Sequence, residues 1–143
     1  MSIHKEIILH CSATPPALDI GFEEIDRWHK ARGWRMCGYH YIIRLDGEIE
    51  RGRELNEQGA HTKGHNKAVG ICYVGGLDEN GKPKDTRTEK QQKALVKLIK
   101  SLALCLGKLE IHGHNEYSSK ACPCFDVTKE YYLHYIANNE QRK

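Results

Sequence analysis

Three segments of the chain contain side chains that are common in catalytic and metal sites: His10, His112-Gly113-His114 and Lys120-Ala121-Cys122-Pro123-Cys124. Each follows a short apolar run or lies in the loop after one, where proteins built on a sheet often place functional groups. Zinc prefers imidazole nitrogen and thiolate sulfur, and a catalytic zinc site keeps three protein ligands and one open position. Together, His10, His114 and Cys122 would make such a set.

Each of these residues has a simpler interpretation when it is taken alone. A strand histidine such as His10 is equally often a hydrogen-bonded structural residue, and a single cysteine such as Cys122 is more often a buried thiol. A four-ligand structural zinc site is disfavoured, because one residue separates Cys122 from Cys124 and the sequence has no second cysteine pair. Only the combination favours a catalytic metal site.

The composition limits the class of protein without identifying it. The chain has 143 residues, and its 22 Lys and Arg against 19 Asp and Glu leave a net charge of +3. This length suits a single domain covering residues 1–143. The charge is too small to indicate nucleic-acid binding. Six cysteines are too few for a disulfide scaffold, and they are expected to be reduced if the protein is made in the cytosol.

The sequence also bears on where the protein is made. Its first residues, MSIHKEIILH, lack the apolar core of a signal peptide, and no apolar run approaches the roughly 20 residues that cross a bilayer. We therefore expect synthesis in the cytoplasm, without membrane insertion. Cys11, Cys72 and Cys105 fall in apolar periodic segments and are expected in the core.

Apolar periodicity and turn residues predict the elements that must position these side chains. They predict strands at 6–11, 69–74 and 109–111, a hairpin at 38–51 that turns at Asp46-Gly47, and helices at 22–32, 88–106 and 125–137. Thr88 and Gln91 form a capping box at the start of the second helix. This order of elements predicts one α/β domain with a central mixed sheet packed with about three helices.

Five segments in order resemble the type-2 N-acetylmuramoyl-L-alanine amidases, which share their fold with the peptidoglycan recognition proteins. They are LHCSAT at 9–14, GYHYIIRLDGEIERGR at 38–53, GAHTKGHN at 59–66, GICYVGG at 70–76 and GHNEYSSKACPCFD at 113–126. Within that family, the five segments resemble those of the small phage endolysins. The resemblance implies hydrolysis of the amide between N-acetylmuramic acid and L-alanine of the stem peptide in peptidoglycan.

The resemblance also implies roles for individual residues. The family's zinc ligands correspond to His10, His114 and Cys122, because its second histidine ligand stands eight residues before the cysteine. One zinc ion per chain is therefore expected. The family's catalytic tyrosine and lysine correspond to Tyr39 and Lys120. Either can stabilise the oxyanion or protonate the leaving nitrogen, and the sequence leaves that division open.

Several further residues in the matching segments have more than one possible role. His40 and His61 are candidates for substrate binding, for positioning a metal ligand, or for a purely structural role. His112 is left out of the ligand set. Cys124 stands where the phage-type pattern usually has a small residue, which leaves open competition for the metal or a disulfide on oxidation.

Two other functions remain open on the sequence. One is a catalytically silent module that binds peptidoglycan or a partner, although members without activity typically lack the ligand at Cys122. The other is a cysteine hydrolase with Cys122 as nucleophile and His114 as base, which leaves His10 and Tyr39 unexplained. The leading expectation is a monomeric phage or prophage endolysin, or a bacterial wall amidase, that acts on the wall after release or export.

Overall fold

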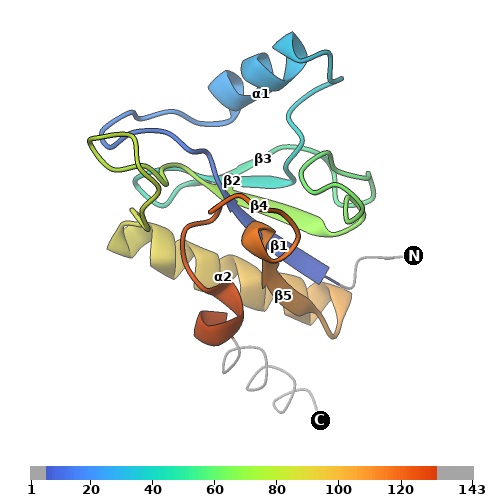
Figure 1. Ribbon diagram of the computed structural model, residues 1–143. Helices are drawn as coiled ribbons and strands as arrows, with labels where there is room; N and C mark the ends of the chain where they lie inside the picture. Colours follow the sequence, from blue (N-terminus) through green and yellow to red (C-terminus); the bar gives the residue numbers. More distant parts are fainter. Residues whose placement is uncertain (1–5, 132–143) are drawn as a thin grey trace.

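A five-stranded mixed sheet forms the centre of the protein (Figure 1), whose computed structural model describes residues 6–131. The strand order is β3-β2-β4-β1-β5. The strands are β1 (Glu6–Cys11), β2 (Tyr41–Ile43), β3 (Ile49–Arg51), β4 (Val69–Tyr73) and β5 (Glu110–Gly113). β1 runs parallel to β4 and β5, β2 runs parallel to β4, and β3 closes one edge as the antiparallel arm of a hairpin.

The long helix α2 (Glu89–Leu106) covers one face of the sheet (Figure 1). It begins where Thr88 Oγ1 accepts a hydrogen bond from the backbone N–H of Gln91, and Gly107 follows its last turn. Helical spacing places its buried residues on one side, against Ile7 and Leu9 of β1. These helix residues are Leu95, Leu98, Ile99 and Leu102.

The shorter helix α1 (Phe22–Ala31) lies on the opposite side of the sheet (Figure 1). Ile25 packs there in a second apolar cluster with Ile42 of β2 and Cys72 of β4. Within α1, Asp26 pairs with Lys30 across 2.9 Å. The sheet therefore lies between α2 on one side and α1 on the other.

Strand β1 presents different chemistry to these two sides because successive side chains of a strand point to opposite faces. Ile7 and Leu9 pack towards α2, whereas Ile8 and His10 point to the face that carries α1. His10 is the second-last residue of β1, and the neighbouring strand β5 leads directly into the short 3-10 helix η1 (His114–Glu116). The polar residues of the site thus gather on one face, near the carboxyl ends of parallel strands.

The structure confirms the predicted mixed sheet packed with about three helices, and it confirms the order of the elements. The third helix begins at residue 127, and the part of its predicted range beyond residue 131 lies outside the described residues. Cys11 and Cys72 are buried as expected, but Cys105 is exposed on the last turn of α2, so its assignment to the core is wrong. None of the helices described could span a membrane.

Candidate metal centre

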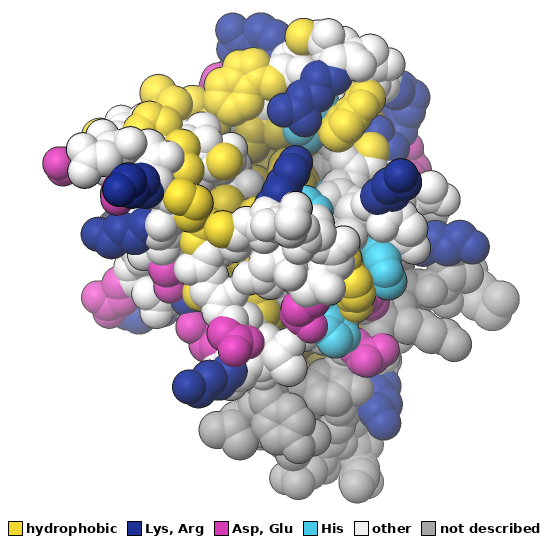
Figure 2. Space-filling model, in the orientation of Figure 1, with side chains coloured by type: hydrophobic (Ala, Val, Ile, Leu, Met, Phe, Trp, Pro, Cys, Tyr) yellow, Lys and Arg dark blue, Asp and Glu magenta, His cyan; other side chains and the backbone are white. Residues whose placement is uncertain are grey.

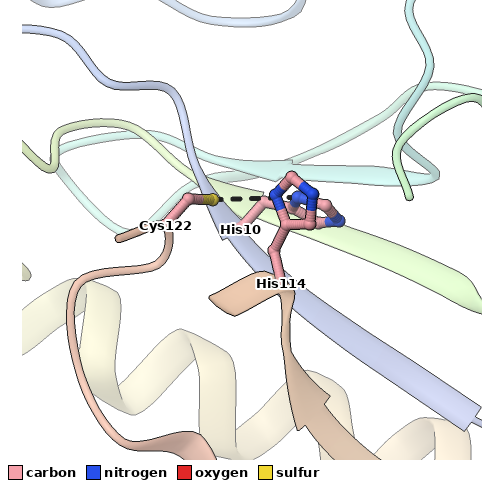
Figure 3. A group of neighbouring side chains, drawn as sticks. All are labelled: His10, His114 and Cys122. Atoms are coloured by element: carbon pink, nitrogen blue, oxygen red, sulfur yellow. Dashed lines mark hydrogen bonds between the residues drawn. The ribbon is translucent and has the colours of Figure 1, made fainter. Parts of the chain in front are cut away.

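The side chains of His10, His114 and Cys122 converge on one point of the molecule (Figure 3). One potential ligand atom from each lies within 4.8 Å of those of the other two, and no other group of three or more such residues is found between residues 6 and 131. His10 Nδ1 is 3.8 Å from Cys122 Sγ, and the rings of His10 and His114 have centroids 4.7 Å apart. The structure therefore brings together the three ligands expected from the sequence.

Backbone pairing fixes the relative positions of the two histidines. Leu9 of β1 pairs with Gly113 of β5 in a parallel register, so the next residues of the two strands, His10 and His114, lie side by side. His10 is 2% exposed, and its place in β1 is held by β4 on one side and β5 on the other. A side chain on an inner strand is held rigidly, as a metal ligand must be.

Cys122 reaches the site from a loop that is attached to the sheet at two points. The hydroxyl of Tyr73 on β4 donates a 2.7 Å hydrogen bond to the carbonyl oxygen of Pro123. The backbone N–H of Cys11 donates to Cys122 Sγ across 3.2 Å. These contacts hold the sulfur beside His10, although the two residues are far apart in the sequence.

The electrostatic environment keeps the two histidines neutral. Burial lowers the pKa of His10 well below its ordinary value, and the nearby His61, His114 and Lys120 lower it further. Burial also lowers the pKa of His114, with a smaller effect from the positive charge of Lys120. Neutral imidazole is the form that ligates metals. Two such nitrogens with one sulfur, in a half-open site, are the donor set of a catalytic zinc centre.

Tyr39 and Lys120 lie beside this group. The Tyr39 ring is 5.1 Å from the His10 ring, and burial raises the pKa of Tyr39 so that its phenol keeps its proton. Lys120 is exposed, and its effect on the pKa of His10 and His114 places its charge near both rings. Figure 2 shows histidine and basic side chains close together on this face.

Helix α1 holds the segment that leads into Tyr39. Asp26 Oδ1 accepts a 2.7 Å hydrogen bond from the backbone N–H of Cys37, and His29 Nδ1 accepts one of 2.9 Å from that of Gly38. Burial lowers the pKa of His29 to about 4, so Nδ1 remains an acceptor. His29 was not among the site residues predicted from the sequence. Its position one helical turn after Asp26 was the signal that both side chains face the same segment.

His40 and His61 have neighbouring rings, with centroids 5.9 Å apart, but they make different hydrogen bonds. His40 is fully buried, its Nδ1 accepts from the backbone N–H of Gly70, and its Nε2 donates to the carbonyl oxygen of Glu57. This ring therefore joins two backbone segments, which agrees with the structural role among the three that the sequence left open. His61 instead contacts His10, with 2.9 Å between His61 Nδ1 and His10 Nε2.

His112 and Cys124 lie outside the ligand group. His112 Nδ1 is 2.8 Å from a carboxylate oxygen of Glu116, and its Nε2 is 3.4 Å from one of Glu110. Cys124 Sγ contacts the carbonyl oxygen of Gly76 at 3.3 Å and lies 3.9 Å from Cys11 Sγ. In this structure Cys124 is therefore a neighbour of the candidate metal centre and not part of it.

Comparison with known proteins gives the class of enzyme that this fold and site define. Residues 2–125 match the family model described as N-acetylmuramoyl-L-alanine amidase. The endolysin of Klebsiella phage KP32 is 42% identical over 126 residues, covering 87% of this chain and 83% of the endolysin. The endolysin of Escherichia phage T7 is 41% identical over 124 residues, covering 86% and 82%.

A solved structure agrees with the sequence comparisons. The N-acetylmuramoyl-L-alanine amidase LysC from Clostridium intestinale URNW aligns with a TM-score of 0.78 at 28% identity, covering 94% of this chain and 85% of that chain. The chain belongs to the N-acetylmuramoyl-L-alanine amidase family. Its activity is accordingly that of a peptidoglycan amidase, which cleaves the bond between N-acetylmuramic acid and L-alanine of the stem peptide.

Proposed function

We propose that this amidase depends on zinc, and that His10, His114 and Cys122 hold one Zn²⁺ per chain. The observation that supports this proposal is the convergence of the three ligand atoms within 4.8 Å of one another. Bound zinc would supply a Lewis acid that polarises the amide carbonyl and lowers the pKa of water. The three protein ligands leave a position open for this chemistry.

Two side chains beside the ligands would assist the reaction. Hydrolysis joins a water oxygen to the lactyl carbonyl carbon and breaks the bond to the alanine nitrogen, which takes up a proton. Negative charge builds on the carbonyl oxygen before the bond breaks. The neutral Tyr39 phenol and the Lys120 ammonium are hydrogen-bond donors next to His10 and His114, so both can stabilise that charge. Either can also protonate the leaving nitrogen.

We further propose that the protein acts as a phage-type endolysin on the cell wall after its release from the cytoplasm, and that it works as a monomer. The similarity to the phage KP32 and T7 endolysins over more than four fifths of each chain supports this role. Peptidoglycan would then be its macromolecular partner.

Digestion of purified cell walls tests the reaction. We expect new amino groups on L-alanine without new reducing sugar ends, whereas new reducing ends would show a glycosidase. If neither product is released, the protein would instead be a catalytically silent binding module of the same fold.

Treatment with a chelator separates zinc catalysis from a cysteine hydrolase. We expect the chelator to abolish wall digestion and added zinc to restore it. Activity that survives the chelator but is lost on alkylation of Cys122 would point to a thiol nucleophile and would contradict the zinc proposal.

A further inference from the structure

His61 forms a contact with His10 that the reaction described above does not use. Its Nδ1 lies 2.9 Å from His10 Nε2, and the two rings meet edge to face at 85° with centroids 4.9 Å apart. We infer that His61 is a positioning residue that fixes His10 in the tautomer whose Nδ1 is free to bind the metal. This inference rests on the zinc site proposed above.

The hydrogen bonds of His61 determine where its own proton lies. Its Nε2 is 3.0 Å from the carbonyl oxygen of Ala68, which can only accept a hydrogen bond. Nε2 of His61 must therefore carry the hydrogen. In a neutral imidazole the other nitrogen then has a lone pair, so Nδ1 of His61 is an acceptor.

The same reasoning then fixes the tautomer of His10. Because Nδ1 of His61 offers a lone pair, the facing Nε2 of His10 must carry a hydrogen, since otherwise two lone pairs would meet at 2.9 Å. Nδ1 of His10 is thereby left unprotonated, and this is the nitrogen that faces Cys122 Sγ. A backbone carbonyl thus sets the ligand tautomer through one intervening imidazole. Such partners commonly orient metal-ligating histidines.

Thr62 completes this arrangement without changing it. Its Oγ1 is 3.2 Å from His10 Nε2 and 3.0 Å from His61 Nδ1. The hydroxyl can share the hydrogen of His10 Nε2 as an acceptor or share the lone pair of His61 Nδ1 as a donor, and each of these is consistent with the same tautomers. Thr62 is buried, so this small network is shielded from water.

Two features of the fold position the His61 ring beside His10. Asn66 Oδ1 accepts hydrogen bonds from the backbone N–H groups of His61 and Thr62, at 2.7 and 2.8 Å, and so holds their loop. The ring lies over Gly70 of β4, where a Cβ atom would come within 2.5 Å of His61 Cδ2. Glycine at this strand position therefore leaves room for the ring beside His10.

Two substitutions of the same branched shape test whether the acceptor matters. His61→Asn keeps an oxygen that can take the place of Nδ1, whereas His61→Leu has no acceptor. We expect zinc affinity, measured by competition with a chromophoric chelator, to fall by roughly 10- to 100-fold in His61→Leu. His61→Asn should retain most of the wild-type affinity. His65→Leu, in the same loop, serves as the control and should bind zinc as the wild type does.

Equal zinc affinity in the Leu and Asn variants, whether reduced or unchanged, would overturn the inference, because an acceptor at position 61 would then make no difference to zinc binding. A wild-type protein that binds no zinc would instead overturn the proposed zinc site.

The tautomer can be measured separately from metal binding. Nitrogen-15 shifts of the His10 ring in zinc-free wild-type protein should show hydrogen on Nε2 and none on Nδ1. Hydrogen on Nδ1 would overturn the inference even if zinc binds to the protein as proposed.

Discussion

The backbone N–H of Cys11 donates a hydrogen bond to Sγ of Cys122, across 3.2 Å. β1 therefore contributes two things in succession: the imidazole of His10 and, one residue later, a donor to the sulfur. A hydrogen bond to sulfur from an inner strand orients the sulfur without using its capacity to bind a metal. The end of β1 is thus the structural centre of the site.

Cys122→Ser tests the sulfur ligand. The hydroxyl of serine keeps the size and the contact with the Cys11 N–H but is a poor zinc ligand. We expect zinc affinity to fall by more than the roughly 100-fold that loss of a supporting residue costs, and wall digestion to stop. Zinc content by mass spectrometry and release of alanine amino groups measure the two effects.

Cys124→Ser is the matched control for this change. Cys124 lies two residues after Cys122 and outside the ligand group. The zinc content of the Cys124→Ser protein should therefore equal that of the wild type. Loss of zinc in Cys124→Ser, or full activity in Cys122→Ser, would show that the wrong cysteine has been assigned.

Tyr39→Phe and Lys120→Met test the two hydrogen-bond donors. Loss of one oxyanion donor typically lowers kcat by about 10²- to 10³-fold, and we expect each variant to fall in this range. Zinc content should not change, because neither side chain is a ligand in this account. Tyr41→Phe and Lys100→Met, which alter the same residue types away from the site, should keep wild-type rates. A variant at Tyr39 or Lys120 with an unchanged rate would exclude that residue from catalysis.

Asp26→Asn tests the support that α1 gives to the segment before Tyr39. Burial alone would raise the pKa of Asp26, but the hydrogen bonds from Lys30 and the Cys37 N–H lower it below its ordinary value of 3.8. A carboxyl group with a lowered folded-state pKa stabilises the protein above its unfolded pKa, and this contribution is lost as the pH falls through the folded value.

The difference in unfolding free energy between wild type and Asp26→Asn should therefore be present at pH 7 and shrink towards pH 3. Urea unfolding at several pH values measures it. A difference that does not vary with pH would contradict the assigned role of the carboxylate.

Arg87→Met tests the attachment of the third helix to the rest of the fold. The Arg87 side chain is 2% exposed, pairs with Asp85 at 2.9 Å and with Glu130 at 2.6 Å, and lies over the Phe125 ring, 3.5 Å from its centroid. Removing one partner of a buried ion pair costs about 3–5 kcal/mol, and because both carboxylates here are partly exposed we expect roughly 2 kcal/mol.

Urea unfolding of Arg87→Met should show this loss of stability, while the zinc content of the folded protein stays the same. A variant as stable as the wild type would mean that the three charges contribute no net stability.

The sequence predicted those elements whose signals are local. The capping residues Thr88 and Gln91 and the apolar spacing of α2 lie within one segment, and the hairpin has its own turn at Asp46-Gly47, so both were predicted correctly. Cys105 was placed in the core wrongly. Helical periodicity shows which residues share a face, but it does not show where the packing partner of that face ends.

The contacts around the site were harder to predict because they join distant segments. His10 and His61 meet only after β1 and β4 have paired and the loop before β4 has folded over Gly70. The resemblance to a family marked His61 as a candidate without showing what it touches. The hydrogen bond between His29 and the segment before Tyr39 likewise depends on where α1 packs, and no local sequence pattern encodes that packing.

Anomalous scattering from crystals of the purified protein, recorded on both sides of the zinc absorption edge, tests the central claim most directly. The account predicts one zinc ion per chain, bound by His10 Nδ1, a ring nitrogen of His114 and Cys122 Sγ. No zinc signal in active protein, or zinc bound at any other group of residues, would contradict it.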